Sequence, residues 1–117
     1  MRMETGFGWI RVGETTYDHD IIIHADGEVT KRKKKASKSL KGEYGHTPLS
    51  EHELDILGQE KPDRVFIGTG NSGALPLTPG ARTILREYDT VILPIPALLP
   101  LLEEERKPYV AILHVTC

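Results

Sequence analysis

The second half of the chain alternates short apolar segments with helical ones, and this order limits the fold more than any other feature. Residues 63–68, 90–93 and 109–115 are apolar runs typical of buried strands. Segments with helical features separate them, at about residues 78–88 and 97–106. Strands joined by helices require a largely parallel sheet with crossover connections. We therefore expect an α/β fold.

The first thirty residues predict an antiparallel meander of three strands. We expect these strands at Phe7–Val12, Tyr17–His24 and Glu28–Lys31. Asp26-Gly27, between the last two strands, is a strong hairpin signal. The three isoleucines at residues 21–23 put apolar groups on both faces of their strand, so we expect both faces to be covered.

Two helices have clear start signals. Ser50 followed by Glu53 forms a capping box, which predicts a helix over residues 51–59. Thr78 followed by Pro79 places an N-cap and a proline at the first helical position, which predicts the start of the next helix.

The size and composition fit a single domain, residues 1–117. A chain of 117 residues with 38% hydrophobic content is long enough to bury one core. No apolar run is long enough to span a bilayer, and the N-terminus lacks an apolar secretory segment. We expect a cytoplasmic protein that makes no membrane contact. The one cysteine, Cys117, has no partner for an intramolecular disulfide.

The charge is distributed unevenly along the chain. Residues 31–41 contain seven cations and no acid, although the net charge of the whole chain is −2. Aromatic residues are not interleaved with these cations, and the acidic remainder repels a long polyanion, so nucleic acid is disfavoured as a partner. We expect a solvated loop here. The alternative is that its cations help to bind a small anion.

The chain contains one asparagine, one glutamine and many charged residues. This composition is typical of proteins from hot environments, so we hypothesise a thermophilic source.

The candidate binding site is a glycine-rich loop after the strand at residues 63–68. A tight turn built from glycines leaves backbone amides free to bind an anion or a carbonyl oxygen. The alternative is a tight strand exit that binds no ligand. The candidate ligand-binding residues are Gly68, Thr69, Gly70, Asn71, Ser72 and Gly73 in the loop, with Lys31, Arg32, Lys33 and His46 as neighbours.

Two catalytic motifs match this loop only in part. The glycine spacing resembles a dinucleotide fingerprint, but the prolines at 76 and 79 delay the helix that should begin inside the motif. Ser72, Asp89 and His114 follow the order of a hydrolase triad, but Ser72 does not enter a helix and Asp89 precedes its strand. The histidines show no ligand spacing. We therefore predict no catalytic residue, no cofactor and no metal.

Several short motifs occur together in one order. They are Asp26-Gly27 with the basic stretch, Gly45-His46-Thr47, Ile67-Gly68-Thr69-Gly70 with Gly73-Ala74-Leu75, and Ala111-Ile112-Leu113-His114-Val115-Thr116-Cys117. In these motifs the chain resembles a small domain family of unknown function. That family includes mitochondrial respiratory complex I assembly factor three, the adipogenesis-associated domain protein, and archaeal and bacterial single-domain members.

The resemblance implies a three-layer α/β fold with a mixed central sheet, helices on both faces and an N-terminal antiparallel β extension. It implies no established catalytic activity, and it favours protein contacts over turnover. The hypothesis is a non-enzymatic binding or assembly-type module with an anion- or partner-binding cleft at the glycine-rich loop. The alternative is a small-anion or nucleotide receptor, or an enzyme of unknown reaction, that uses the same cleft. Self-association is a further option, because an open sheet leaves edges.

Overall fold

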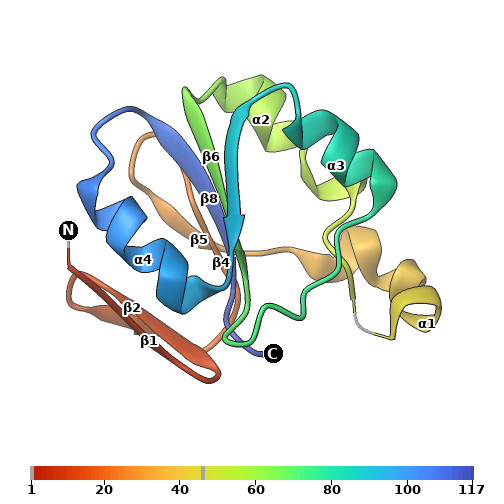
Figure 1. Cartoon of the computed structure of the whole chain (residues 1–117), viewed down its shortest axis with the longest axis horizontal. Helices are drawn as coiled ribbons and strands as arrows, with labels where there is room; N and C mark the ends of the chain where they lie inside the picture. The colour runs from red at the N-terminus through yellow and green to blue at the C-terminus, as the bar shows by residue number, and fades with distance from the viewer. Residues whose placement is uncertain (1, 46) are drawn as a thin grey trace.

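The computed structural model describes residues 2–45 and 47–117, and it confirms the three-layer α/β fold (Figure 1). A mixed five-stranded sheet lies at the centre, with the strand order β5-β4-β8-β6-β7. Its strands are β4 (Ile21–Ile23), β5 (Val29–Lys31), β6 (Arg64–Thr69), β7 (Asp89–Leu93) and β8 (Tyr109–His114).

The strand directions follow from the connections. β6 pairs in parallel with both β7 and β8, as expected for strands joined by helices. β4 pairs antiparallel with β5 through the predicted hairpin and antiparallel with β8. Ile21 and Ile23 are buried on one face of β4, and Ile22 packs against the cluster on the other, which confirms that both faces are covered.

The N-terminal β extension is a separate sheet, and here the predicted strands were partly wrong. It contains β1 (Met3–Gly6), β2 (Trp9–Val12) and β3 (Thr15–Tyr17), all antiparallel. The predicted strand at residues 17–24 is broken between β3 and β4, because the chain leaves the outer sheet there and enters the central one. The pattern of β1 is too short and too polar to indicate a strand.

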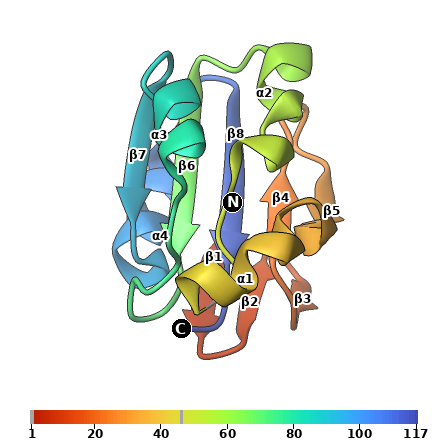
Figure 2. The ribbon, with the colours of Figure 1, turned by 90° about the vertical axis from the view of Figure 1, so that its right-hand side faces the viewer.

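The helices cover the two faces of the central sheet as the resemblance implied (Figures 1 and 2). α4 (Ile95–Glu104) lies on one face, where it also contacts β1 of the outer sheet. α2 (Asp55–Glu60) and α3 (Pro79–Leu85) lie on the other face. Each face therefore has its own apolar cluster, one around Phe66 and Leu98 and the other around Ile67 and Leu57.

The capping signals place the helices correctly but not their details. Thr78 accepts a hydrogen bond from the amide of Ala81 and begins α3. Ser50 accepts one from the amide of His52, but a 3-10 turn, η2 (Glu51–Glu53), precedes α2. The Glu53 carboxylate binds Arg32 instead of returning to the cap, because a buried guanidinium requires a partner.

Most residues of the segment 31–41 are exposed, as predicted, but the prediction that the segment is a loop was wrong. The segment forms a 3-10 helix, η1 (Lys34–Leu40), which leads into α1 (Lys41–Tyr44). Ser37 holds η1 in place because its side chain is fully buried and its hydroxyl bonds to Ser50 and Glu53. Among the described residues, no helix is long and apolar enough to cross a membrane.

Gly70 has a left-handed backbone with φ of 98°, and it lies against the main chain of the C-terminal segment. A Cβ atom there would lie 2.5 Å from the carbonyl carbon of Cys117 and 2.8 Å from the carbonyl oxygen of Thr116. Gly27 has a similar φ of 90°, but a Cβ atom there would meet nothing within 4 Å. Substitutions at the two glycines therefore distinguish the cost of a left-handed backbone from the cost of close packing.

We expect Gly27→Ala to lower the free energy of unfolding by about 1–2 kcal/mol, which is the cost of left-handed backbone for alanine. Gly70→Ala should cost at least about 2 kcal/mol more, because backbone atoms must also move. Urea denaturation of both variants measures the difference. Equal losses would show that the C-terminal segment yields easily and does not constrain Gly70.

Candidate functional site

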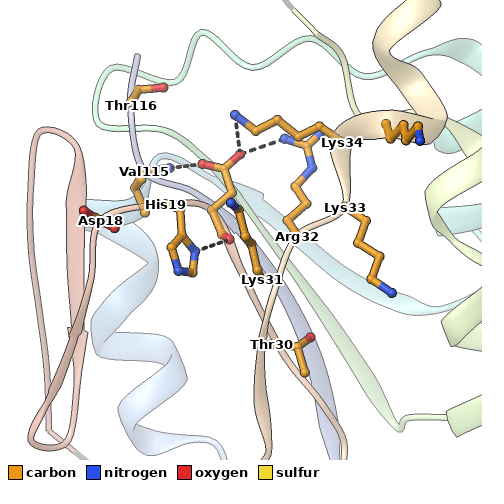
Figure 3. A pocket seen from close by; sticks show the side chains of 11 residues that line it. Asp18, His19, Thr30, Lys31, Arg32, Lys33, Lys34, Val115 and Thr116 are labelled. Atoms are coloured by element: carbon orange, nitrogen blue, oxygen red, sulfur yellow. Dashed lines mark hydrogen bonds and ion pairs between the residues drawn. The ribbon is translucent and has the colours of Figure 1, made fainter.

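A pocket of about 710 Å³ lies beside the basic segment, between the strands β4 and β5 and the residues that follow β8 (Figure 3). One part of its wall comes from the turn before β4, one from the end of β5 and the start of η1, and one from the C-terminal segment. The lining residues are Asp18, His19, Asp20, Thr30, Lys31, Arg32, Lys33, Lys34, Lys35, Val115 and Thr116.

The carboxylate of Asp20 is the centre of this pocket, although Asp20 is only 3% exposed. Its Oδ2 accepts from Arg32 Nη1 at 2.8 Å and from His114 Nδ1 at 2.8 Å. The same oxygen lies 3.4 Å from Lys34 Nζ. Its Oδ1 accepts from the amide of Val115 at 2.9 Å.

The sheet register explains why these groups meet. Ile21 of β4 lies opposite Leu113 of β8, so the residue before β4 lies next to the end of β8. Ile21 also lies opposite Lys31 of β5, and the amide of Arg32 donates to the carbonyl of Asp20 at 2.9 Å. Three strand ends therefore bring an acid, an arginine and a histidine together.

The guanidinium of Arg32 is buried, and each of its three nitrogens donates at least one hydrogen bond. Its Nε and Nη2 form a fork on the carboxylate of Glu53, at 2.7 and 2.9 Å. Nη2 also donates to the carbonyl of Pro48 at 3.0 Å. Burial lowers the pKa of Arg32, but the Glu53 and Asp20 carboxylates outweigh it and raise the pKa above its usual value. Arg32 is therefore a charged structural link.

The Asp20 carboxyl is held in its charged form. Burial raises its pKa, but the hydrogen bonds from His114 and Val115 and the charge of Lys34 outweigh this effect. Together they hold the pKa of Asp20 well below the ordinary value of about 4.

A hydrogen-bonded chain continues from Asp20 to the pocket surface. His114 turns Nδ1 toward Asp20, and its Nε2 lies 3.1 Å from Oγ1 of Thr116. Residues two apart on an extended strand point to the same side, which places Thr116 beside the imidazole. Thr116 is partly exposed and lines the pocket.

The glycine-rich loop contacts the C-terminal segment rather than this pocket. The amides of Asn71 and Ala74 donate to the carbonyls of Thr116 and Cys117, at 2.8 and 2.9 Å. The Asn71 side chain donates to the carbonyls of Gly6 and Val115. None of the loop residues Gly68, Thr69, Gly70, Asn71, Ser72 and Gly73 is among those that line the pocket.

The glycines of the loop have packing reasons of their own. A Cβ atom on Gly68 would lie 2.8 Å from Ile95 of α4 and 2.9 Å from Leu113 of β8. Gly68 thus permits the close approach of α4, and Gly70 that of the C-terminal segment. The loop geometry therefore supports the alternative of a tight strand exit, and anion binding at the loop stays an untested prediction.

The predicted cations have different surroundings. Lys31 and Lys33 are exposed and line the pocket, and in Figure 3 Lys33 extends away from Lys34. Arg32 is bonded internally. His46 lies outside the described residues. Lys34 and Lys35, which the prediction did not select, line the pocket beside Asp20.

The residues of the weak hydrolase motif are not assembled. Asp89 begins β7 opposite Arg64, whereas His114 lies opposite Thr69 at the other end of the parallel strands. Five residues of strand separate the two ends by roughly 16 Å. The hydroxyl of Ser72 donates to the carbonyl of Cys117 instead.

A second chain of the same type lies near α2. His24 Nδ1 is 2.6 Å from Glu60 Oε2, and His24 Nε2 is 2.7 Å from Thr30 Oγ1. Glu60 also accepts from the amide of Ala25, so this chain fastens the β4–β5 hairpin to α2. Among the described residues, no group of three or more histidine, cysteine or acidic side chains could hold a metal ion.

Sequence reasoning missed Asp20, Glu53, His114 and Thr116 as site residues. A signal for the first existed, because Asp20 directly precedes the isoleucine run and His114 ends the last apolar run. Pairing those two strands antiparallel would have placed the two side chains together. Glu53 was assigned to a capping box, and no local pattern indicates its contact with Arg32.

Two of the solved structures that match this chain extend over nearly its whole length. The crystal structure of a conserved hypothetical protein, PH1505 from Pyrococcus horikoshii OT3, is 32% identical to this chain, covers 100% of both chains and has a TM-score of 0.85. A protein named MT938 is 33% identical over 97% of this chain and 96% of its own, with a TM-score of 0.78. No protein-family model and no curated protein matches the chain.

We expect Arg32→Met to lower the free energy of unfolding by about 3–5 kcal/mol, because it leaves the carboxylates of Asp20 and Glu53 buried without their shared cation. The control is Arg11→Met, which breaks a pair with Glu4 whose side chains are 40% and 44% exposed. That change should cost no more than about 1 kcal/mol. Urea unfolding measures both, and similar losses would contradict the structural role of Arg32.

The depressed pKa of Asp20 makes stability depend on pH. A carboxyl whose pKa is lower in the folded than in the unfolded protein stabilises the fold above its unfolded pKa of about 4, and this contribution is lost as the pH falls below that value. We expect a lower free energy of unfolding at pH 3 than at pH 7.

The matching variant is Asp20→Asn, which cannot titrate. It should be less stable than the wild type at pH 7, and it should lose less stability between pH 7 and pH 3. A variant that loses as much as the wild type over this interval would assign the acid sensitivity to other carboxylates.

Proposed function

This chain belongs to the family of the conserved hypothetical protein PH1505 of Pyrococcus horikoshii, and that description states no activity. We therefore propose a function from the pocket. The protein is a binding module that takes a small anionic ligand between the end of β5, the start of η1 and the C-terminal segment. The ligand carries a carboxylate or phosphate group.

The observation that supports this proposal is the excess of positive charge in the pocket wall. Five cations line it against two carboxylates, those of Asp18 and Asp20. Asp20 already accepts hydrogen bonds from Arg32, His114 and the amide of Val115. In the part of the chain that the structure describes, the lysines of the wall other than Lys34 form no ion pair and are left to attract an anion; they are Lys31, Lys33 and Lys35.

Lys34 is suited to contact the ligand directly. Its side chain is 44% exposed and lies 3.4 Å from Asp20 Oδ2, which is longer than the other contacts of that oxygen. A lysine ammonium on a flexible stem can turn from one anion to another at small cost. The ligand would share Lys34 with Asp20, while Arg32 stays in place.

The size of the pocket favours a small molecule over a protein segment. Its volume of about 710 Å³ lies within the range of small-molecule sites, roughly 300–1,000 Å³. A partner protein would instead require a flat interface of about 800 Å² on each side.

An assembly role remains a separate proposal. The motifs in the sequence resemble the family of mitochondrial complex I assembly factor three, and we propose that PH1505 and this chain belong to that same family. The central sheet has two edge strands, β5 and β7, which a second copy or a partner could extend. We also propose that the chain comes from a thermophilic organism, and the relative from Pyrococcus horikoshii supports this.

We expect citrate and pyrophosphate, tested separately at constant ionic strength, to raise the melting temperature. A ligand at ten times its Kd stabilises the native state by about 1.4 kcal/mol. For a domain of this size the melting temperature should rise by about 3–7 °C. The triple variant Lys31→Gln, Lys34→Gln, Lys35→Gln should lose this shift.

The control is Lys38→Gln, Lys41→Gln, Lys107→Gln, which removes the same charge from residues outside the pocket wall. It should keep the shift. If both triple variants lose the shift equally, the effect is one of net charge and the proposed site is wrong. Native mass spectrometry of the same samples reads the bound ion and the oligomeric state together.

A further inference from the structure

The second feature of the pocket is the hydrogen-bonded chain that runs from Thr116 through His114 to Asp20. We propose that this chain gives the protein an acyl-transfer activity, in which Thr116 is the nucleophile, His114 the general base and Asp20 the residue that positions His114. The substrate class is an ester or thioester that carries an anionic group.

The order and the directions of the hydrogen bonds fit this chemistry. Asp20 is charged and accepts from Nδ1 of His114, so a neutral imidazole carries its proton on Nδ1. Nε2 is then an acceptor, and the Thr116 hydroxyl, 3.1 Å away, donates to it. An acid, an imidazole and a hydroxyl in this order activate a hydroxyl oxygen in unrelated hydrolases.

Solvent exposure increases from the acid through the imidazole to the hydroxyl, as catalysis by such a chain requires. The Asp20 side chain is 2% exposed and that of His114 is 11% exposed. Thr116 is more accessible and lines the 710 Å³ pocket, so a substrate in the pocket can reach its oxygen. The amide of Val115 fixes the other oxygen of Asp20, which prevents the carboxylate from rotating.

The second chain, from Thr30 through His24 to Glu60, is a less suitable candidate. Its acid is 23% exposed and its imidazole 19% exposed, so water competes for both. Glu60 is also bonded to the amide of Ala25, on the hairpin that this chain fastens to α2. Thr30 lines the same pocket as Thr116, so the deeper burial of Asp20 and His114 is what distinguishes the two chains.

The reaction would proceed in two balanced steps. Thr116 Oγ1 attacks the carbonyl carbon and its proton passes to His114 Nε2. The tetrahedral intermediate then collapses, the bond to the leaving group breaks, and His114 returns the proton to the leaving alcohol or thiol. Water, deprotonated by His114, cleaves the acyl-threonine ester in the second step, which releases the carboxylic acid and restores the Thr116 hydroxyl.

The anionic part of the substrate class rests on the function proposed above. Lys34 lies beside Asp20 and would orient a carboxylate or phosphate of the substrate. Its ammonium would also stabilise the negative charge that develops on the carbonyl oxygen. The hydrogen-bonded chain itself does not depend on this preference.

The experiment uses the full chain with p-nitrophenyl acetate and with p-nitrophenyl hydrogen succinate, which is anionic. We expect release of p-nitrophenol by the wild type and, in tandem mass spectrometry, an acyl group on Thr116 that hydroxylamine removes. Hydroxylamine sensitivity distinguishes a threonine ester from a chemically acylated lysine. Thr116→Val replaces only the hydroxyl, by a methyl group of similar size, and should lower the rate at least 100-fold, as for loss of an essential catalytic group.

Three further variants test the assignment. Thr116→Ser keeps a hydroxyl and should retain activity within about tenfold of the wild type. Thr83→Ala removes an exposed hydroxyl on α3 that bonds to the carbonyl of Pro79, and it should have no effect. Asp20→Asn should lower kcat and leave KM largely unchanged, because His114 loses the acceptor that fixes its tautomer and its orientation.

The proposal is overturned if wild type and Thr116→Val release p-nitrophenol at the same rate, or if the hydroxylamine-sensitive acyl group is on another residue, Thr30 included. Circular dichroism of each variant checks that it is folded. Anion binding and acyl transfer can fail separately. Thermal shifts without turnover would leave the binding module alone, and equal rates with both esters would leave acyl transfer without the anionic preference.

Discussion

The buried charge of Arg32 is the constraint on which the rest of the structure depends. Arg32 is only 2% exposed, and a guanidinium buried this deeply is tolerated only when its donors are bonded and its charge is balanced. Asp20, Glu53 and the carbonyl of Pro48 meet this requirement, and they come from two separate parts of the chain, before β4 and before α2. Arg32 therefore links the entry to β4, the end of β5 and the turn before α2. The position of the basic segment follows from this link.

The C-terminal segment connects the two regions that the sequence marks as unusual. On one side, its carbonyls accept from the amides of the glycine-rich loop. On the other side, His114 and Thr116 point toward Asp20 and the pocket. The glycines therefore allow the loop to press against the segment, which in turn holds the residues beside the pocket. The glycine-rich loop, whose sequence predicts a ligand-binding turn, thus stabilises the C-terminal segment in the structure.

The sequence predicted the elements better than the site, for physical reasons. Apolar runs and capping residues such as Thr78 are local signals, and both strand order and helix starts follow from them. Glu53 shows the limit of such local signals. Its spacing from Ser50 predicts a capping box, but in the structure its carboxylate binds Arg32 instead. The charged guanidinium of Arg32 attracts a carboxylate more strongly than a neutral backbone amide does. The basic segment shows the same limit. The burial of Ser37 and its hydrogen bond to Glu53 order the segment, and the lysine-rich composition does not indicate this contact.

The sequence by itself determined the α/β class, the parallel order of the last three strands and the need for glycine after β6, because these depend on periodicity and backbone freedom. The tertiary structure alone decided that Asp20 meets His114, which lies 94 residues away in the chain. It also decided that the exposed cations of the basic segment are all lysines, because Arg32 is the one cation of the segment that is buried. Both outcomes depend on the register of β4 against β8 and on which charge is buried, and neither is encoded in a local pattern.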